Sequence, residues 1–160
     1  MAVDIKAIIQ LLRDKGCVSL KDNQGKVIEL IPHDNWESHA GRGDGIFLLF
    51  DLFQIRSIAM PFSDVSLDIV EFNTKPVIYH TPANQNLAHA PTLNGQIKFA
   101  LIRDGNWNKL LFTYGKLLIC QTITDDRKAD FEVLDKFPLL GQGVKEMFLG
   151  PEGEVKILKG

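Results

Sequence analysis

The chain has 160 residues, of which 45% are hydrophobic and 24% are charged, and its formal net charge is −2. These values are typical of a globular protein, and we expect residues 1–160 to form a single compact domain. The charged residues are scattered, so the chain lacks a basic block for a phosphate backbone, and it lacks the run of about 20 apolar residues that spans a membrane. We therefore expect a soluble, cytoplasmic protein that contacts neither nucleic acid nor membrane.

The first segment has the pattern of an amphipathic helix. Its apolar residues recur at the spacing i, i+3, i+4, i+7, which places them on one face: Ile5, Ile8, Ile9 and Leu12. Asp4 can cap the start of this helix and Gly16 can end it. The period then changes, and residues 17–20 and 26–31 are predicted to form a β-hairpin.

The middle of the chain favours a run of further strands. Alternating or continuously apolar segments predict strands at residues 45–50, 54–60, 65–72, 75–81, 98–102, 109–115 and 116–123. A weaker helical stripe predicts a second helix near residues 125–137, ended by Pro138. The turn "GPEG" predicts a last hairpin between residues 144–149 and 154–158.

This grouping of strands predicts an α+β fold. The sheet is expected to be mainly antiparallel and curled or barrel-like, with the N-terminal helix and the helix near 125–137 at its side. The segment "IFLLFDLF" favours a core strand and leaves open a strand shared across a homo-oligomer. Cys17 and Cys120 have apolar neighbours and are expected to be buried thiols.

The four histidines lie in or beside two polar segments. The first is "HDNWESHAGRGDG", residues 33–45, and the second spans residues 80–96. Neutral imidazole binds metals and titrates near neutral pH, so these segments would form a shared site if they meet in the fold. The ordinary alternative is that both are surface loops whose polar groups bond to water and form turns. The candidate ligand-binding residues are His39, Arg42, His80, Asn84, Asn86 and His89.

Two stretches are similar to part of a known family. Residues 16–33 followed by 43–50 resemble the opening of FMN-binding split-barrel proteins of the pyridoxamine-phosphate-oxidase-like group, and residues 80–91 resemble a polar segment of that group. The resemblance implies a flavin-binding redox protein with FMN as cofactor. The second stretch comes two strands late, and basic residues for the flavin phosphate are not evident, so no residue role is transferred.

No assembled catalytic motif is present. The sequence lacks phosphate-binding loops of the G-x-x-x-x-G-K-S/T kind, C-x-x-C, H-E-x-x-H and G-x-S-x-G. The leading hypothesis is therefore a non-catalytic domain that binds a small molecule or a protein partner, without metal or cofactor. The first alternative is the FMN-binding split-barrel-like redox protein. The second is a metal-dependent hydrolase that uses His33, His39, His80 and His89.

Overall fold

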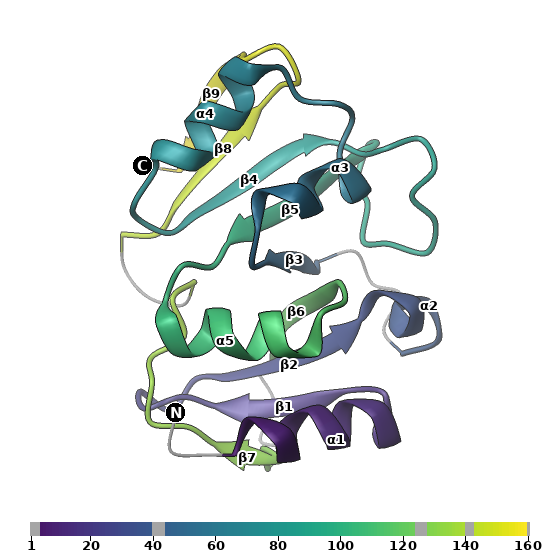
Figure 1. The fold of residues 1–160 in the computed structure, drawn as a ribbon, viewed down its shortest axis with the longest axis vertical. Coiled ribbons are helices and arrows are strands. Elements are labelled where there is room, and N and C mark those ends of the chain that lie inside the picture. Colours follow the sequence, from purple (N-terminus) through teal and green to yellow (C-terminus); the bar gives the residue numbers. More distant parts are fainter. Residues whose placement is uncertain (1–3, 40–43, 124–127, 140–142, 160) are drawn as a thin grey trace.

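The computed structural model describes residues 4–39, 44–123, 128–139 and 143–159 (Figure 1). The helical elements are α1 (Ile5–Lys15), η1 (His33–Asn35), α2 (Trp36–His39), η2 (Leu52–Gln54), α3 (Ile55–Ile58), α4 (Asp64–Phe72) and α5 (Gly105–Tyr114). The strands are β1 (Val18–Lys21), β2 (Val27–Pro32), β3 (Ile46–Leu49), β4 (Val77–Pro82), β5 (Gln96–Leu101), β6 (Leu118–Ile123), β7 (Phe131–Glu132), β8 (Lys145–Leu149) and β9 (Val155–Lys159).

Within these ranges, nine strands form one sheet in the order β7-β1-β2-β6-β3-β5-β4-β8-β9. Most neighbouring strands are antiparallel, but β1–β7, β3–β5 and β4–β8 are parallel pairs. The expectation of a sheet with helices is therefore confirmed, but the sheet is mixed and only mostly antiparallel. No helix among the described residues is long and apolar enough to cross a membrane.

Several expected elements are present. The predicted N-terminal helix is α1, where the Asp4 carboxylate accepts a bond from the Lys6 amide at 2.9 Å and Gly16 adopts a left-handed φ of 82°. Residues 18–32 form the β1–β2 hairpin, and residues 145–159 form the β8–β9 hairpin. Both cysteine thiols are free and buried, as expected.

Four predictions are wrong, and helix capping explains two of the errors. Residues 65–72 belong to α4, which begins at the Ser63 cap, and residues 109–114 belong to α5, which begins at the Asp104 cap. Residues 52–58 are η2 and α3 instead of a strand. The helix expected near 125–137 is replaced at residues 131–132 by β7, because this segment pairs with β1 instead of with its own backbone. Residues 124–127 lie outside the described part of the chain.

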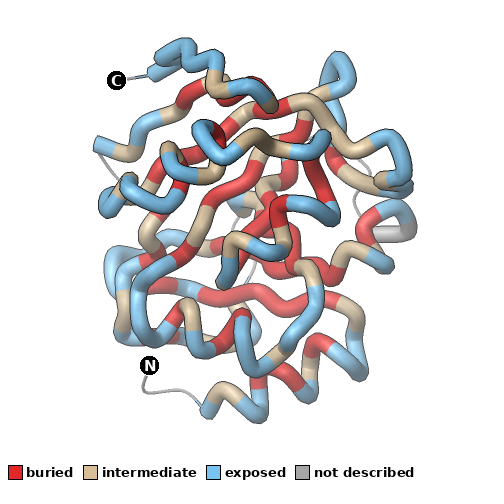
Figure 2. The backbone as a smooth tube through the Cα atoms, turned by 45° about the horizontal axis from the view of Figure 1, so that its top comes forward, coloured by how far each residue is buried: buried red, intermediate tan, exposed pale blue. Residues whose placement is uncertain are grey.

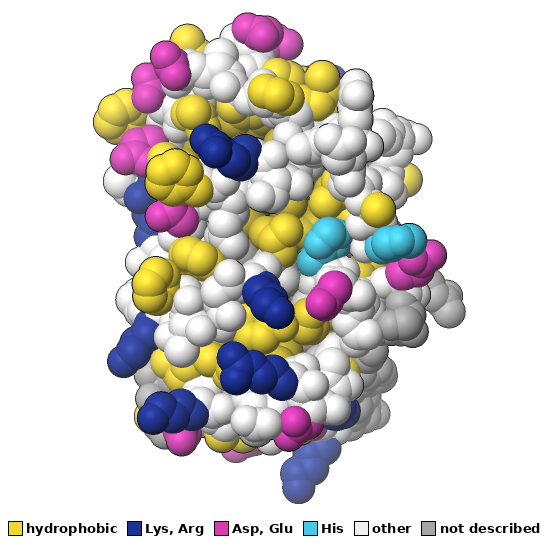
Figure 3. Space-filling view, turned by 45° about the vertical axis from the view of Figure 1, so that its right-hand side comes forward, with side chains coloured by type: hydrophobic (Ala, Val, Ile, Leu, Met, Phe, Trp, Pro, Cys, Tyr) yellow, Lys and Arg dark blue, Asp and Glu magenta, His cyan; other side chains and the backbone are white. Residues whose placement is uncertain are grey.

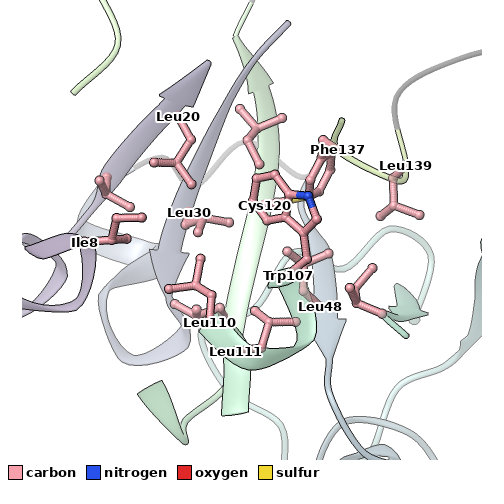
Figure 4. Close-up of a cluster of buried hydrophobic side chains, with 14 of the residues drawn as sticks. Ile8, Leu20, Leu30, Leu48, Trp107, Leu110, Leu111, Cys120, Phe137 and Leu139 are labelled. Atoms are coloured by element: carbon pink, nitrogen blue, oxygen red, sulfur yellow. The ribbon is translucent and has the colours of Figure 1, made fainter. Parts of the chain in front are cut away.

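The sheet separates two apolar cores. The first core packs α1 and α5 against β1, β2 and β6, and the Trp107 ring meets Phe137 edge-on at 5.0 Å (Figure 4). The second core packs α3 and α4 against β4, β5 and β8. Alternate side chains of β3 supply both cores, since Leu48 lies in the first and Phe47 and Leu49 lie in the second. Buried segments run along the strands between exposed outer helices and loops (Figure 2).

Candidate functional site

The two polar segments of the sequence lie side by side. The His33 Nε2 atom is 2.9 Å from the carbonyl oxygen of Ala88, and the His89 ring contacts the Glu37 carboxylate in what is an ion pair when the ring is protonated. Histidine side chains gather on one face of the molecule, next to an acidic side chain (Figure 3). We call this contact between η1–α2 and the loop that follows β4 the two-loop face.

His80 lies apart from these contacts. It is on β4, where its Nε2 atom is 2.9 Å from Glu146 Oε1 on β8. It alternates along the strand with Tyr79, a second-core residue, so its side chain occupies the opposite face of the sheet. The His39 side chain and all of Arg42 lie outside the described residues. Among the residues that are described, no group of three or more His, Cys, Asp or Glu could hold a metal ion.

The candidate asparagines shape the loop after β4. The Asn84 side-chain amide donates to the Arg56 carbonyl oxygen at 3.0 Å, and its oxygen accepts from the Asn86 amide at 2.9 Å. The Asn84 backbone amide also donates to the Ile58 carbonyl oxygen at 2.8 Å. Asn84 therefore fastens this loop to α3, while Asn86 is exposed.

An apolar hollow with aromatic walls includes three residues, Ile55, Arg56 and Leu67, that lie in segments predicted as strands. It has a volume of about 500 Å³ and lies between η2–α3 and the start of α4. Its lining is mostly apolar: Leu52, Phe53, Ile55, Pro61, Phe62 and Leu67, with Asp51 and Arg56. We call it the α3–α4 pocket. Its volume falls within the range of about 300–1,000 Å³ that is usual for ligand sites.

Local bonds hold the pocket walls in place. The Asp51 carboxylate caps η2 by accepting from the Phe53 amide at 2.9 Å, and the Gln54 side chain accepts from the Phe50 amide at 2.8 Å. The Arg56 guanidinium lies over the Phe53 ring, 5.6 Å from its centroid. None of the described residues gives Arg56 a carboxylate partner, whereas the pocket's one carboxylate is already engaged as a cap. The rim therefore offers a cation beside an exposed aromatic ring.

A smaller hollow of about 360 Å³ adjoins the pocket through Asp51 and Leu52. Its cation is Arg103, which donates to the carbonyl oxygens of Val70 at 3.3 Å and Glu71 at 2.6 Å. The last carbonyl groups of a helix have no hydrogen-bond partner within the helix, so Arg103 stabilises the end of α4 by donating to them. The signals that could have located the α3–α4 pocket were the Asp51 and Ser63 caps, which mark helices on both sides of Pro61.

Titratable groups with a shifted pKa lie away from the pocket. Burial raises the pKa of the Cys120 thiol to about 12. Burial also raises the pKa of Tyr79, against a smaller opposing effect of its bond from Asn73. Both groups are therefore neutral at physiological pH, and neither is poised for acid–base or nucleophilic chemistry.

Comparison with solved structures identifies the fold. Sua5 from P. abyssi, in a H234A/Y235A form, superposes with a TM-score of 0.69 at 10% identity over 96% of this chain and 52% of that one. HypF in its phosphate- and nucleotide-bound form gives 0.66 at 11% identity, over 97% of this chain and 28% of HypF. YciO of E. coli gives 0.68 at 9% identity, over 98% of this chain and 89% of YciO. This chain thus spans about half of Sua5 and less than a third of HypF.

No protein-family model matches the sequence, and no curated protein matches it either. The structural likeness contradicts the expectation of a chain without nucleic-acid partners, because HypF, 28% of which superposes on this chain, is described with a nucleotide bound. A scattered charge and a small net charge are weak grounds for that exclusion, since one guanidinium can hold one phosphate group. The comparisons lend no support to the FMN-binding split barrel or to the metal-dependent hydrolase.

Proposed function

We propose that this chain is a single, non-catalytic domain that binds a small molecule in the α3–α4 pocket. The observation that carries the proposal is the lining of the pocket: apolar and aromatic walls, one guanidinium at the rim that has no carboxylate partner among the described residues, and one carboxylate that already caps η2. Apolar walls with a few placed polar groups are the usual make-up of a ligand site. The lining contains no nucleophile next to a base, so binding without chemistry fits it best.

The chemistry of the walls favours a flat ring joined to an anionic group. Phe53 is 72% exposed, so the side of its ring away from Arg56 can stack on a ligand ring. Arg56 can donate a charge-assisted pair of hydrogen bonds to a phosphate. Nucleotides combine both groups, and the nucleotide-bound HypF structure of the same fold supports testing them first. FMN belongs to this class as well, since its flavin ring is flat and carries a phosphate chain.

Calorimetric titration with AMP, ATP and FMN tests the proposal, with adenosine and riboflavin as phosphate-free counterparts. Phe53→Ala should weaken binding of all five compounds, whereas Phe112→Ala should not, although Phe112 is an equally exposed phenylalanine on α5. Arg56→Gln should weaken only the phosphate-bearing compounds, by about tenfold or more. Arg13→Gln removes an exposed arginine of α1 and should change nothing. Failure of all five compounds to bind, or equal losses in the control variants, contradicts the proposal.

The two-loop face is a second candidate site, because η1–α2 and the loop after β4 are in direct contact. We propose that this face recognises a ligand or partner through His89 and Glu37. The other candidate residues close to them in the sequence are His39, Arg42, Asn84 and Asn86. His80 would have to act from the opposite face of the sheet. Amide chemical shifts during the same titrations separate the candidates. Changes confined to residues 33–39 and 84–91 would favour this face, and changes at residues 51–67 would favour the pocket.

A further inference from the structure

The two edges of the sheet are built differently. β7, at one edge, has two residues, whereas β9, at the other, has five. Every residue of β9 is exposed, including three large apolar side chains: Val155 at 48%, Ile157 at 56% and Leu158 at 47% (Figure 2). A very short edge strand offers few backbone groups for pairing, while a longer apolar edge is a template for another strand. β9 is thus the edge that can accept a strand.

We propose that β9 pairs in antiparallel fashion with β9 of a second copy of this chain, forming a two-fold symmetric dimer with one continuous sheet. The inference does not depend on the α3–α4 pocket and goes beyond the ligand-binding function. A two-fold axis perpendicular to the sheet requires one residue of β9 to face its own copy, because paired residues must lie on the same face. The central residue of the strand, Ile157, gives the greatest overlap.

Charge supports this register. With the axis at Ile157, Val155 faces Lys159 of the second copy and Lys156 faces Leu158. Each lysine therefore lies opposite an apolar side chain, and no lysine faces another lysine, which would destabilise the pair. The aliphatic part of a lysine can cover an apolar neighbour while its ammonium group stays in water. Lysines on an edge strand oppose unspecific pairing with other strands. In the register centred on Ile157, these lysines do not oppose pairing.

The apolar surface continues from β9 onto α4. Val65 of α4 is 59% exposed and packs against Gly153 in the turn before β9, where an added Cβ atom would come within 2.7 Å of its Cγ1. A standard interface takes about 800 Å² and 20–30 residues from each partner. β9 and residues 150–154 contribute ten residues to such an interface, and the outer side of α4 adds to them, so strand pairing need not hold the dimer alone.

A cysteine cross-link tests the register. Directly opposite residues of antiparallel strands have Cα atoms about 4.5–5.5 Å apart, inside the range of about 4.4–6.8 Å for disulfides. Ile157→Cys should therefore give a covalent dimer with oxidised glutathione, through one disulfide between the two copies. Phe112→Cys, equally exposed on α5, should stay monomeric on a denaturing gel, and the native Cys17 and Cys120 are buried.

Sedimentation measurements on the unmodified chain provide the second arm. We expect a monomer–dimer equilibrium that Ile157→Arg shifts at least tenfold toward monomer and Phe112→Arg leaves unchanged. If Ile157→Arg fails to fold, the cross-link and the sedimentation of the unmodified chain still decide. The proposal is overturned if the unmodified chain stays monomeric at the highest concentration at which it remains soluble. It is also overturned if Phe112→Cys cross-links as fast as Ile157→Cys.

Discussion

The two halves of the sheet, on either side of β3, use their apolar residues differently. Among the described residues, the half covered by α1 and α5 leaves two large hydrophobic side chains exposed, Phe112 and Leu134. The half covered by α3 and α4 leaves eight exposed: Phe53, Met60, Val65, Phe72, Leu93, Val155, Ile157 and Leu158. Surface apolar groups that cluster on one part of a protein mark binding. The first half therefore stabilises the fold, and the second half presents the pocket and the β9 edge.

The largest expected effect comes from opening the first core. Leu110 of α5 is fully buried there, and Leu110→Ala should lower the free energy of unfolding by about 2–5 kcal/mol, because it removes buried contacts and leaves a cavity. Lys109→Ala, the preceding residue on the same helix, is the control: its side chain is exposed, and the change should alter the free energy of unfolding by less than about 0.5 kcal/mol. Urea denaturation measures both. Equal losses in the two variants would mean that α5 does not close this core.

A smaller and more local effect is expected in the second half. Ser66 of α4 is fully buried, and its hydroxyl donates to the carbonyl oxygens of Gly150 at 2.7 Å and Pro151 at 3.0 Å. Ser66→Ala leaves these acceptors without that donor and should cost about 1–3 kcal/mol. Hydrogen exchange should become faster at α4 and at the β8–β9 turn, while α1 keeps its protection. Faster exchange across the whole molecule would show that the halves do not open separately.

The smallest effect is a pH dependence in the first half. Burial acts to raise the pKa of Asp130, but hydrogen bonds from the Ser19 amide, the Lys15 ammonium and the Ser19 hydroxyl outweigh it and hold the pKa below its usual value. A lowered pKa in the folded state stabilises the fold above the unfolded-state pKa, and this is lost as pH falls through the folded-state value. Asp130→Asn should thus be less stable than the unmodified chain at pH 7. The difference in stability between the two should become smaller below a pH of about 4.

Thermal denaturation of Asp130→Asn and of the unmodified chain, followed from pH 7 to acid, measures this difference. A difference in melting temperature that does not change with pH would contradict the role given to Asp130. Asp14→Asn is a suitable control, because Asp14 lies at the exposed end of α1, where its carboxylate accepts a hydrogen bond from the Gln10 side chain of the same helix. Its melting temperature should follow that of the unmodified chain across the same pH range.

Local sequence signals predicted the elements that local contacts stabilise. The spacing of Ile8, Ile9 and Leu12, with the Asp4 cap and Gly16, was enough for α1. The same kind of signal was present for α5, where Asp104 caps the helix and Trp107, Leu110 and Leu111 follow at helical spacing. Residues 109–115 were nevertheless predicted to form a strand, because their apolar run was read without the cap that precedes it, so the helix was missed.

Contacts between distant segments account for the other differences. In α4, the alternation of Val65, Leu67 and Ile69 imitates a strand, but the two fully covered residues, Ser66 and Val70, are four apart, as in a helix. For β7, Asp130 bonds to Ser19, 111 residues away, and no local pattern carries that pairing. The α3–α4 pocket was missed for the same reason, since it exists only when η2–α3 and α4 are packed together.

The span of the first core along the chain bears on how the protein matures. Ile8 and Leu139 belong to the same core, and the buried Asp22 carboxylate accepts from the Phe137 amide at 3.1 Å, across 115 residues. Closing such a large loop loses chain entropy before the stabilising contacts can form, and proteins dominated by contacts between distant segments fold slowly. During synthesis, the first core can therefore be completed only after residue 139 has left the ribosome. Nascent-chain pulling-force measurements should accordingly find no completed first core on any shorter chain.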